Sequence, residues 1–294
     1  MRKRTLVRRA QEAARYASTI GIANAQPIRA LKHMLRRALE RMCSLDGQVI
    51  VDVDGQRMSV PDPRYLWVYA SYEPYTTELF KKAVTAGQTV LDVGACFGYY
   101  SLLAAQRVGK SGRVYAFEPT PDKYAVLRRN IELNGWDDTV VAVPKAVSSH
   151  AGDMSLHLSS FRENNSLSGL PLFATTRALP VEAVTIDEFL DDEPVAVIKM
   201  DVEGYEPYAL DGMTRTIRKS TELTLFTELN VACLQSTGVQ PERFLSQLDS
   251  VGFDVQLIDD EEHKLLPVTT ANLVKAEAYP SRYSNLLCLQ RPHR

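Results

Sequence analysis

The sequence predicts an α/β protein with a mostly parallel sheet covered by helices on both faces, preceded by a helical arm and a β-hairpin. Three observations support this fold class. From about residue 88 onward, short apolar segments alternate with helical ones, as in β-α-β units. A Gly-rich turn joins the first of these apolar segments to a helix. Asp54-Gly55 separates two short strand-like segments, which is a strong hairpin signal.

Composition excludes several classes of protein. Of the 294 residues, 45% are hydrophobic and 24% are charged, as in an ordinary globular protein. No apolar run approaches the ~18–20 residues of a membrane span, and the N-terminus lacks the apolar core of a secretory signal. The four cysteines are scattered, without the spacing of a metal site. We therefore expect a cytoplasmic protein with reduced thiols.

The formal net charge of −2 conceals two unequal parts. Residues 1–41 carry 11 basic and 2 acidic side chains, a net charge of 11 − 2 = +9, so the remaining chain carries −11. Residues 28–42 repeat apolar side chains at helical spacing, with basic residues on the opposite face. This basic amphipathic pattern fits a helix that docks on the domain, or one that contacts an anionic membrane surface, and fits nucleic acid less well.

The expected elements divide the chain into three segments: a basic helical arm over 1–45, a hairpin with an aromatic cap over 46–85, and a catalytic domain over 86–294. The hairpin strands are expected at 48–53 and 56–60. In the third segment we expect strands at 89–93, 113–117, 140–147, 195–201, 223–229, 253–259 and 284–290. Helices are expected at 98–108, 121–134, 206–218 and 241–250. The last strand closely follows another, which predicts an antiparallel insertion near one edge of the sheet.

The Gly-rich turn indicates a bound cofactor. A buried strand ends near Asp92, the chain turns between Gly94 and Gly98, and a helix begins whose N-terminus carries partial positive charge. Glu118 ends the second strand, where an acid can accept hydrogen bonds from ribose hydroxyls. A dinucleotide fingerprint would need glycine where Cys96 and Tyr99 stand, and no phosphate-binding P-loop pattern occurs. The pattern instead suits S-adenosylmethionine, a cationic cofactor without phosphate.

Five segments resemble one family: Y-E-P at 72–74, L-D-V-G-A-x-x-G-Y-Y-S-L at 91–102, F-E-P at 117–119, I-D-E-F-L at 186–190 and I-K-M-D-V-E-G-Y-E at 198–206. Together they resemble the FkbM family of S-adenosylmethionine-dependent methyltransferases. The resemblance implies a Rossmann-like, seven-strand class I methyltransferase sheet and O-methylation of sugar or natural-product hydroxyls. The predicted cofactor residues are Glu73, Asp92, Gly94, Ala95, Cys96, Phe97, Gly98, Glu118, Pro119, Ala146 and Asp201. Cys96 departs from the family, since such turns often carry Asn.

Acidic residues end the two strands on which the chemistry would depend. Asp201 and Glu203 follow one strand, and Glu228 and Asn230 follow the next. A hydroxyl must lose its proton during methyl transfer, so the catalytic candidates are Asp201, Glu203 and Lys199. Lys199 is expected on the same side of the sheet as Asp201, as an ion-pair partner or as a base.

A metal ion is a further expectation at these strand ends. Asp201, Glu228 and Asn230 form an oxygen-rich set that suits Mg²⁺, similar to the site of metal-dependent catechol-type O-methyltransferases. The alternative is metal-free catalysis, with the carboxylates bonded to backbone amides, to Lys199 or to the amino group of the cofactor.

These expectations favour an S-adenosylmethionine-dependent O-methyltransferase that acts on a hydroxyl of a carbohydrate, glycolipid or secondary metabolite. One alternative is an RNA methyltransferase that grips phosphates with the basic arm, but the core is acidic and no [DNS]-P-P-[YF] tetrapeptide occurs. Another is a non-catalytic scaffold that retains the cofactor fold. The polar stretch 161–169 fits an acceptor-binding lid or a plain loop, and His157 fits a surface strand. A homo-oligomeric assembly is also compatible with the sequence.

Overall fold

The computed structural model describes residues 44–45, 48–62, 65–69, 71–159, 166–167, 174–269 and 283–292. The predicted arm lies outside these residues except for the short strand β1 (Ser44–Leu45). Most of the 161–169 stretch also lies outside them. Within the described part of the chain, no helix is both long enough and apolar enough to cross a bilayer.

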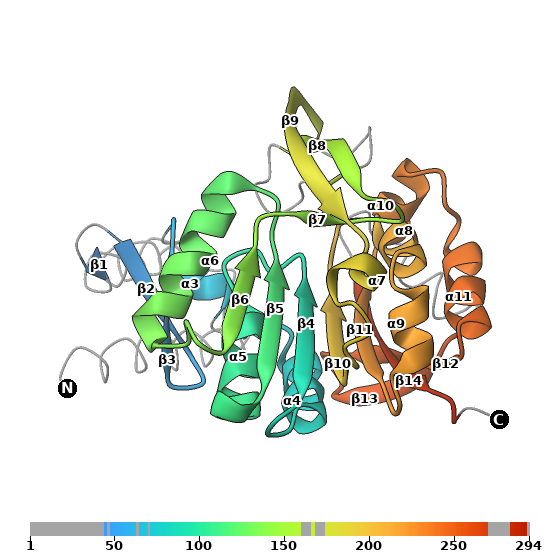
Figure 1. The fold of residues 1–294 in the computed structure, drawn as a ribbon, viewed down its shortest axis with the longest axis horizontal. Coiled ribbons are helices and arrows are strands. Elements are labelled where there is room, and N and C mark those ends of the chain that lie inside the picture. The colour runs from blue at the N-terminus through green and yellow to red at the C-terminus, as the bar shows by residue number, and fades with distance from the viewer. Residues whose placement is uncertain are drawn as a thin grey trace, which may run out of the picture.

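A central sheet of eight strands organises the molecule, in the order β13-β12-β14-β11-β10-β4-β5-β6 (Figure 1). The strands are β4 (Thr89–Val93), β5 (Arg113–Phe117), β6 (Val140–Val143), β10 (Val197–Met200), β11 (Thr224–Leu229), β12 (Phe253–Asp259), β13 (Lys264–Pro267) and β14 (Ser284–Gln290). The five strands from β11 to β6 run parallel. The antiparallel insertion is confirmed, because β14 lies between β11 and β12 and opposes both. The predicted seven strands are present, and β13 adds an eighth at the edge.

Helices cover both faces of this sheet, and each face has its own apolar core. The first group packs with the N-terminal hairpin: α3 (Tyr65–Val68), α4 (Pro74–Ala83), α5 (Tyr99–Val108) and α6 (Pro121–Asn134). The second group covers the opposite face: α7 (Ile186–Phe189), α8 (Glu206–Asp211), α9 (Thr214–Lys219), α10 (Val231–Ser236) and α11 (Pro241–Ser250). Strand alternation divides the two cores, since Val197 packs in the first and the adjacent Ile198 in the second.

Two predicted elements are divided in the structure. The helix expected at 206–218 breaks at Gly212, where a Cβ atom would lie 2.0 Å from the carbonyl oxygen of Ser148. The strand expected at 140–147 ends at Val143, because Pro144 has no N–H group to continue the ladder. The chain then forms β7 (Ala146–Val147).

Strand β7 belongs to a separate three-stranded sheet with β8 (Gly152–Ser159) and β9 (Ala174–Val184). This β8–β9 ribbon stands beyond the carboxyl ends of the parallel strands, at the top of Figure 1. His157 lies on β8, as predicted, where its backbone pairs with Ser166. The ribbon therefore adds a wall above the edge at which ligands of such sheets bind.

The predicted hairpin is confirmed as β2 (Gln48–Val53) and β3 (Gln56–Val60). Asp54 and Gly55 both have positive φ, as a type I′ turn requires. Two asparagines of α6 fasten β3 to the core. The buried Asn130 side chain accepts from Ser59 N at 2.7 Å and donates to Ser59 O at 2.9 Å, and Asn134 bonds both backbone groups of Arg57 in the same way. The side-chain amides thus replace a neighbouring strand.

Asn130→Ala should destabilise the protein strongly, because Asn130 also donates to the carbonyl of Phe97 in the cofactor turn at 2.8 Å. Loss of three hydrogen bonds around buried groups should lower the free energy of unfolding by roughly 2–4 kcal/mol. Urea denaturation measures this change. Arg128→Ala on the same helix is the control, since its exposed pair with Glu132 should contribute at most about 0.5 kcal/mol. Equal effects of the two substitutions would contradict the assigned role of Asn130.

Candidate active site

The turn after β4 lies directly against the end of β10. Asp201 N donates to Val93 O at 2.9 Å, and Gly94 N and Ala95 N both donate to Phe117 O. Gly94 has a φ of 86°, and a Cβ atom there would lie only 1.9 Å from the carbonyl oxygen of Asp201. Glycine is therefore required at this position both by the backbone conformation and by the close approach.

Glu118 holds the rest of the turn in place. Its buried carboxylate accepts from Cys96 N at 2.9 Å and from Thr120 N at 2.8 Å. Cys96 has a φ of 50°, in the left-handed region that Asn tolerates better than most residues. Asn, the residue expected here from the family resemblance, would suit this conformation better than Cys does.

A cavity opens where the turn, the end of β5 and the end of β10 meet. Eight of the eleven residues predicted for the cofactor line it: Asp92, Gly94, Ala95, Cys96, Glu118, Pro119, Ala146 and Asp201. Phe97 and Gly98 lie in the same turn outside this lining. Glu73 does not line the cavity either, but it accepts a hydrogen bond from the hydroxyl of Tyr100, which does.

Aromatic side chains from the segment between α3 and α4 and from the start of α5 form an aromatic wall of the cavity, which the sequence reasoning did not assign to the site. Tyr69 and Tyr99 stack with ring centroids 5.4 Å apart, and Tyr72 meets Tyr99 edge-on at 5.1 Å. All three line the cavity. The signal was present as the aromatic-rich stretch after residue 64, but its spacing does not show which rings reach the cavity. Leu156 and Leu167 of the ribbon region complete the lining.

Asp92 is buried at the cofactor turn. It accepts a hydrogen bond from the hydroxyl of Ser101. Burial raises the pKa of Asp92 from 3.8 to about 6, although Ser101 and the nearby Lys199 ammonium oppose this shift. A buried, ionised carboxylate with few hydrogen-bond donors destabilises a protein that has no ligand bound. A bound cationic ligand would stabilise the charge of Asp92.

Lys199 is a buried cation near several carboxylates, and only 1% of its side chain is exposed. Its Nζ lies 3.6 Å from Asp201 Oδ2 and 3.4 Å from Asn285 Oδ1, and 5.1 Å from the ring centre of Tyr100. Burial alone would lower the pKa of Lys199, but the surrounding carboxylates, Glu73 and Asp201 foremost, outweigh it and raise the pKa above its usual value. The ammonium therefore stays charged at neutral pH.

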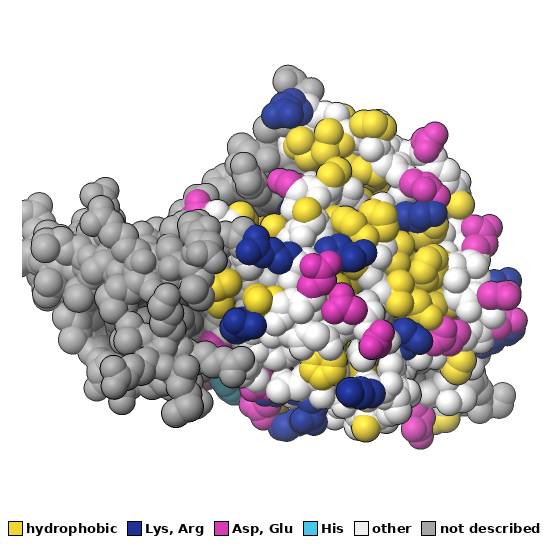
Figure 2. Space-filling view, turned by 60° about the vertical axis from the view of Figure 1, so that its left-hand side comes forward, with side chains coloured by type: hydrophobic (Ala, Val, Ile, Leu, Met, Phe, Trp, Pro, Cys, Tyr) yellow, Lys and Arg dark blue, Asp and Glu magenta, His cyan; other side chains and the backbone are white. Residues whose placement is uncertain are grey.

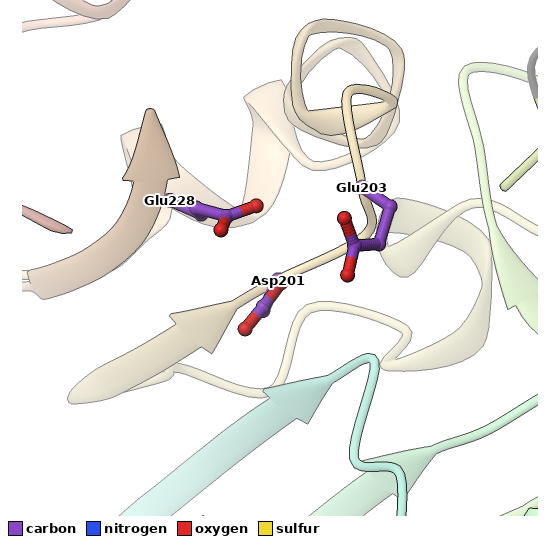
Figure 3. Close-up of side chains that lie close together, drawn as sticks. All are labelled: Asp201, Glu203 and Glu228. Carbon is purple, nitrogen blue, oxygen red and sulfur yellow. The ribbon is translucent and has the colours of Figure 1, made fainter. Parts of the chain in front are cut away.

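Three carboxylates from two neighbouring strand ends converge beside this lysine (Figure 3). In this acidic cluster of Asp201, Glu203 and Glu228, one oxygen from each side chain lies within 4.8 Å of the others. Two such charges 4 Å apart repel by about 4 kcal/mol in a protein-like medium. Burial, followed by repulsion from Asp201 and Glu203, raises the pKa of Glu228 well above its usual range.

The predicted metal ligands lie at these two strand ends and differ in their bonding. Asn230 caps α10, and its side-chain oxygen accepts from Cys233 N at 3.2 Å. Its oxygen is thus already bonded to the backbone, whereas Glu203 joins Asp201 and Glu228. Spacing along the sequence does not distinguish these two cases, because both residues follow a strand by one or two positions.

Comparison with known proteins gives a family. The family model for the methyltransferase FkbM domain matches residues 92–255, more than half of the chain. Hexuronic acid methyltransferase AglP of Haloferax volcanii is 29% identical over 182 residues, 60% of this chain and 72% of that protein. A protein-L-isoaspartate O-methyltransferase of Aeropyrum pernix is 46% identical over 57 residues, which span only 19% of this chain and 22% of that protein.

Among solved structures, an O-methyltransferase from Thermotoga maritima matches at 13% identity and a TM-score of 0.44, over 83% of this chain and 78% of that chain. This score is too low to support an argument about function.

Gly94→Ala should disrupt the cofactor turn. The variant carries the strain of a left-handed alanine, about 1–2 kcal/mol, and must also displace the backbone of Asp201. Gly135→Ala is the matched control, because Gly135 also has positive φ but a Cβ there meets nothing within 4 Å. We expect a larger fall in the free energy of unfolding for Gly94→Ala than for Gly135→Ala, together with loss of cofactor binding in calorimetry. Cofactor binding at unchanged affinity in Gly94→Ala would contradict the close approach.

Asp92→Asn should stabilise the empty protein while weakening cofactor binding. Because the folded-state pKa of Asp92 is raised, the folded protein binds more protons than the unfolded chain between about pH 4 and 6. Its stability therefore declines across this window as pH rises. Asn removes that decline and should raise the free energy of unfolding at pH 7 by roughly 1–3 kcal/mol.

The measurement is urea denaturation without cofactor at several pH values. Asp260→Ala is the control of opposite sign, since Asp260 accepts from Tyr75 N, Thr76 N and Thr76 Oγ1 and so caps α4. The free energy of unfolding of Asp260→Ala should be lower by about 1–2 kcal/mol than that of the natural protein. A loss of stability in Asp92→Asn would show that the Asp92 charge stabilises the fold.

Proposed function

The chain belongs to the FkbM family of S-adenosylmethionine-dependent methyltransferases, and we propose that it methylates a hydroxyl oxygen of a carbohydrate, glycolipid or secondary metabolite. The observation that carries this proposal is the meeting of the cofactor turn with Asp201 and Glu203 in one cavity. The hexuronic acid methyltransferase relative supports a sugar as the acceptor class.

The residues around the cavity fit the cofactor in charge and in hydrogen-bonding capacity. The carboxylate of Glu118 keeps acceptor capacity for ribose hydroxyls after binding two backbone amides, since an ionised carboxylate offers about four acceptor sites. Asp92 and Asp201 place negative charge where the cationic end of the cofactor would lie. When bound, S-adenosylmethionine supplies an electrophilic methyl group on a positively charged sulfur.

Asp201 and Glu203 are the proposed proton acceptors. Both line the cavity, and a hydroxyl oxygen that receives a methyl group must give its proton to a group within hydrogen-bond reach. Lys199 does not take this role in our proposal, because an ammonium that stays charged has no lone pair to accept a proton. Its ion pair with Asp201 instead orients that carboxylate.

The aromatic wall supports an acceptor with flat apolar faces. Tyr69, Tyr72 and Tyr99 line the cavity, and Val68, which also lines it, is 45% exposed. The C–H faces of a sugar ring pack well on aromatic rings, while its hydroxyls bond to carboxylates. Figure 2 shows one face of the molecule on which acidic and basic side chains are interspersed with hydrophobic ones. The RNA alternative depends on residues 1–41, which lie outside the described residues.

Transfer from isotopically labelled S-adenosylmethionine tests the proposal. The purified full chain is incubated with uronic acids, neutral sugars, glycolipids and total RNA, and the labelled product is located by mass spectrometry. A methyl ether on a sugar or metabolite oxygen is the expected product. Label in RNA alone would favour the RNA alternative, and cofactor binding without transfer to any class would favour the scaffold alternative.

Glu118→Ala should weaken S-adenosylmethionine binding by about tenfold or more, because it removes both the ribose partner and the bonds to Cys96 N and Thr120 N. Glu118→Gln retains the size and one carbonyl oxygen, so it should fall between Ala and the natural residue. Isothermal titration calorimetry with S-adenosylhomocysteine measures both. An affinity unchanged by Glu118→Ala would remove Glu118 from the cofactor site.

A further inference from the structure

The acidic cluster of Asp201, Glu203 and Glu228 lies where the carboxyl ends of β10 and β11 meet. Glu228 lies near the end of β11, Asp201 follows β10, and Glu203 lies in the turn before α8. Figure 3 shows the carboxylates of Glu203 and Glu228 facing one another across a space, with that of Asp201 below them in this view. Asp201 and Glu203 also line the cavity, so that space is continuous with the proposed acceptor site.

A second, independent observation indicates that this space suits a cation. Glu228 is 95% buried, since only 5% of it is exposed, and its Oε2 atom has no hydrogen-bond partner within the described part of the chain. Buried carboxylate oxygens in native proteins almost always have a donor or a cation. The neighbouring cation Lys199 is directed to Asp201, with Nζ 3.6 Å from Asp201 Oδ2.

The spacing of the oxygens fits a hard divalent cation. Mg²⁺ binds oxygen at about 2.1 Å, which places its ligand atoms roughly 3–4 Å from one another, and Ca²⁺ allows up to about 5 Å. The oxygens of the three side chains lie within 4.8 Å of one another. Ca²⁺ spans this separation directly, and a small rotation of the side chains would bring it into the Mg²⁺ range. An all-carboxylate set without His or Cys favours Mg²⁺ or Mn²⁺ over softer metals.

We propose that Asp201, Glu203 and Glu228 bind one divalent cation, Mg²⁺ or Mn²⁺, beside the methyl-acceptor site. This ligand set replaces the Asn230 of the sequence-based expectation by Glu203, whose carboxylate lies in the cluster while the Asn230 oxygen caps α10. A cation here would neutralise the cluster and polarise an acceptor hydroxyl. Each ligating carboxylate has a second oxygen, so the proton acceptor proposed above is retained. The inference deepens the proposed function and rests on it for its chemical role only.

The test measures metal binding by the full chain without cofactor or acceptor. The electron paramagnetic resonance signal of free Mn²⁺ is followed as protein is added, and Mg²⁺ is then used as competitor. We expect one Mn²⁺ per chain, displaced by Mg²⁺, and an affinity weakened roughly tenfold or more in Glu228→Gln. Gln retains the size of the buried Glu228 side chain, so the variant should fold, which its thermal unfolding verifies. Glu132→Gln, an exposed carboxylate on α6, is the control with the same change of charge.

The absence of binding up to about 1 mM Mn²⁺ would overturn the cation site, and so would equal affinity in Glu228→Gln and Glu132→Gln. The proposed function is judged separately by methyl transfer. Transfer that continues unchanged in the presence of a chelator would overturn the cation site and leave the methyltransferase proposal standing. Specific Mn²⁺ binding without transfer to any hydroxyl acceptor would support the site and overturn the proposed acceptor chemistry.

Discussion

The close contact between the ends of β4 and β10 is the constraint on which the site depends. Gly94 has no side chain, so its backbone lies against the carbonyl of Asp201, and Asp201 N bonds back to Val93 O. This contact places the cofactor turn beside Asp201 and Glu203, and all of them line the same cavity. A methyltransferase needs its cofactor and its proton acceptor within a few ångströms of each other, and this pair of strand ends supplies that proximity.

Charge is concentrated here at the expense of stability. The buried Lys199 ammonium is surrounded by carboxylates, and burial raises the pKa of both Asp92 and Glu228. A protein selected for stability alone would not bury so many acids around one lysine, because an incompletely paired buried charge is costly. The arrangement is consistent with a site that is completed by cationic ligands, and the S-adenosylmethionine sulfonium is one of them.

The elements added to the sheet shape the cavity and fasten it. Asn130 bonds the backbone of β3 and the carbonyl of Phe97, so the hairpin and the cofactor turn share one anchor. Ser166, whose backbone pairs with β8, donates from its Oγ to the carbonyl of Glu203 at 2.8 Å. This hydrogen bond connects the β8–β9 ribbon to the turn that carries Glu203. The N-terminal hairpin is thus connected to the cofactor turn, and the insertion after β7 is connected to the turn that carries Glu203.

The sequence by itself determined the α/β class, the hairpin, most strands, the cofactor turn and the family, because hydrophobic period, turn chemistry and short motifs are local properties of the chain. Tertiary structure decided which polar groups meet. Asp260 caps α4 from 185 residues away, and Glu203 lies beside Glu228 while Asn230 caps α10. The order β4-β10-β11 sets these meetings, and that order arises from pairing between distant segments, which no local pattern encodes.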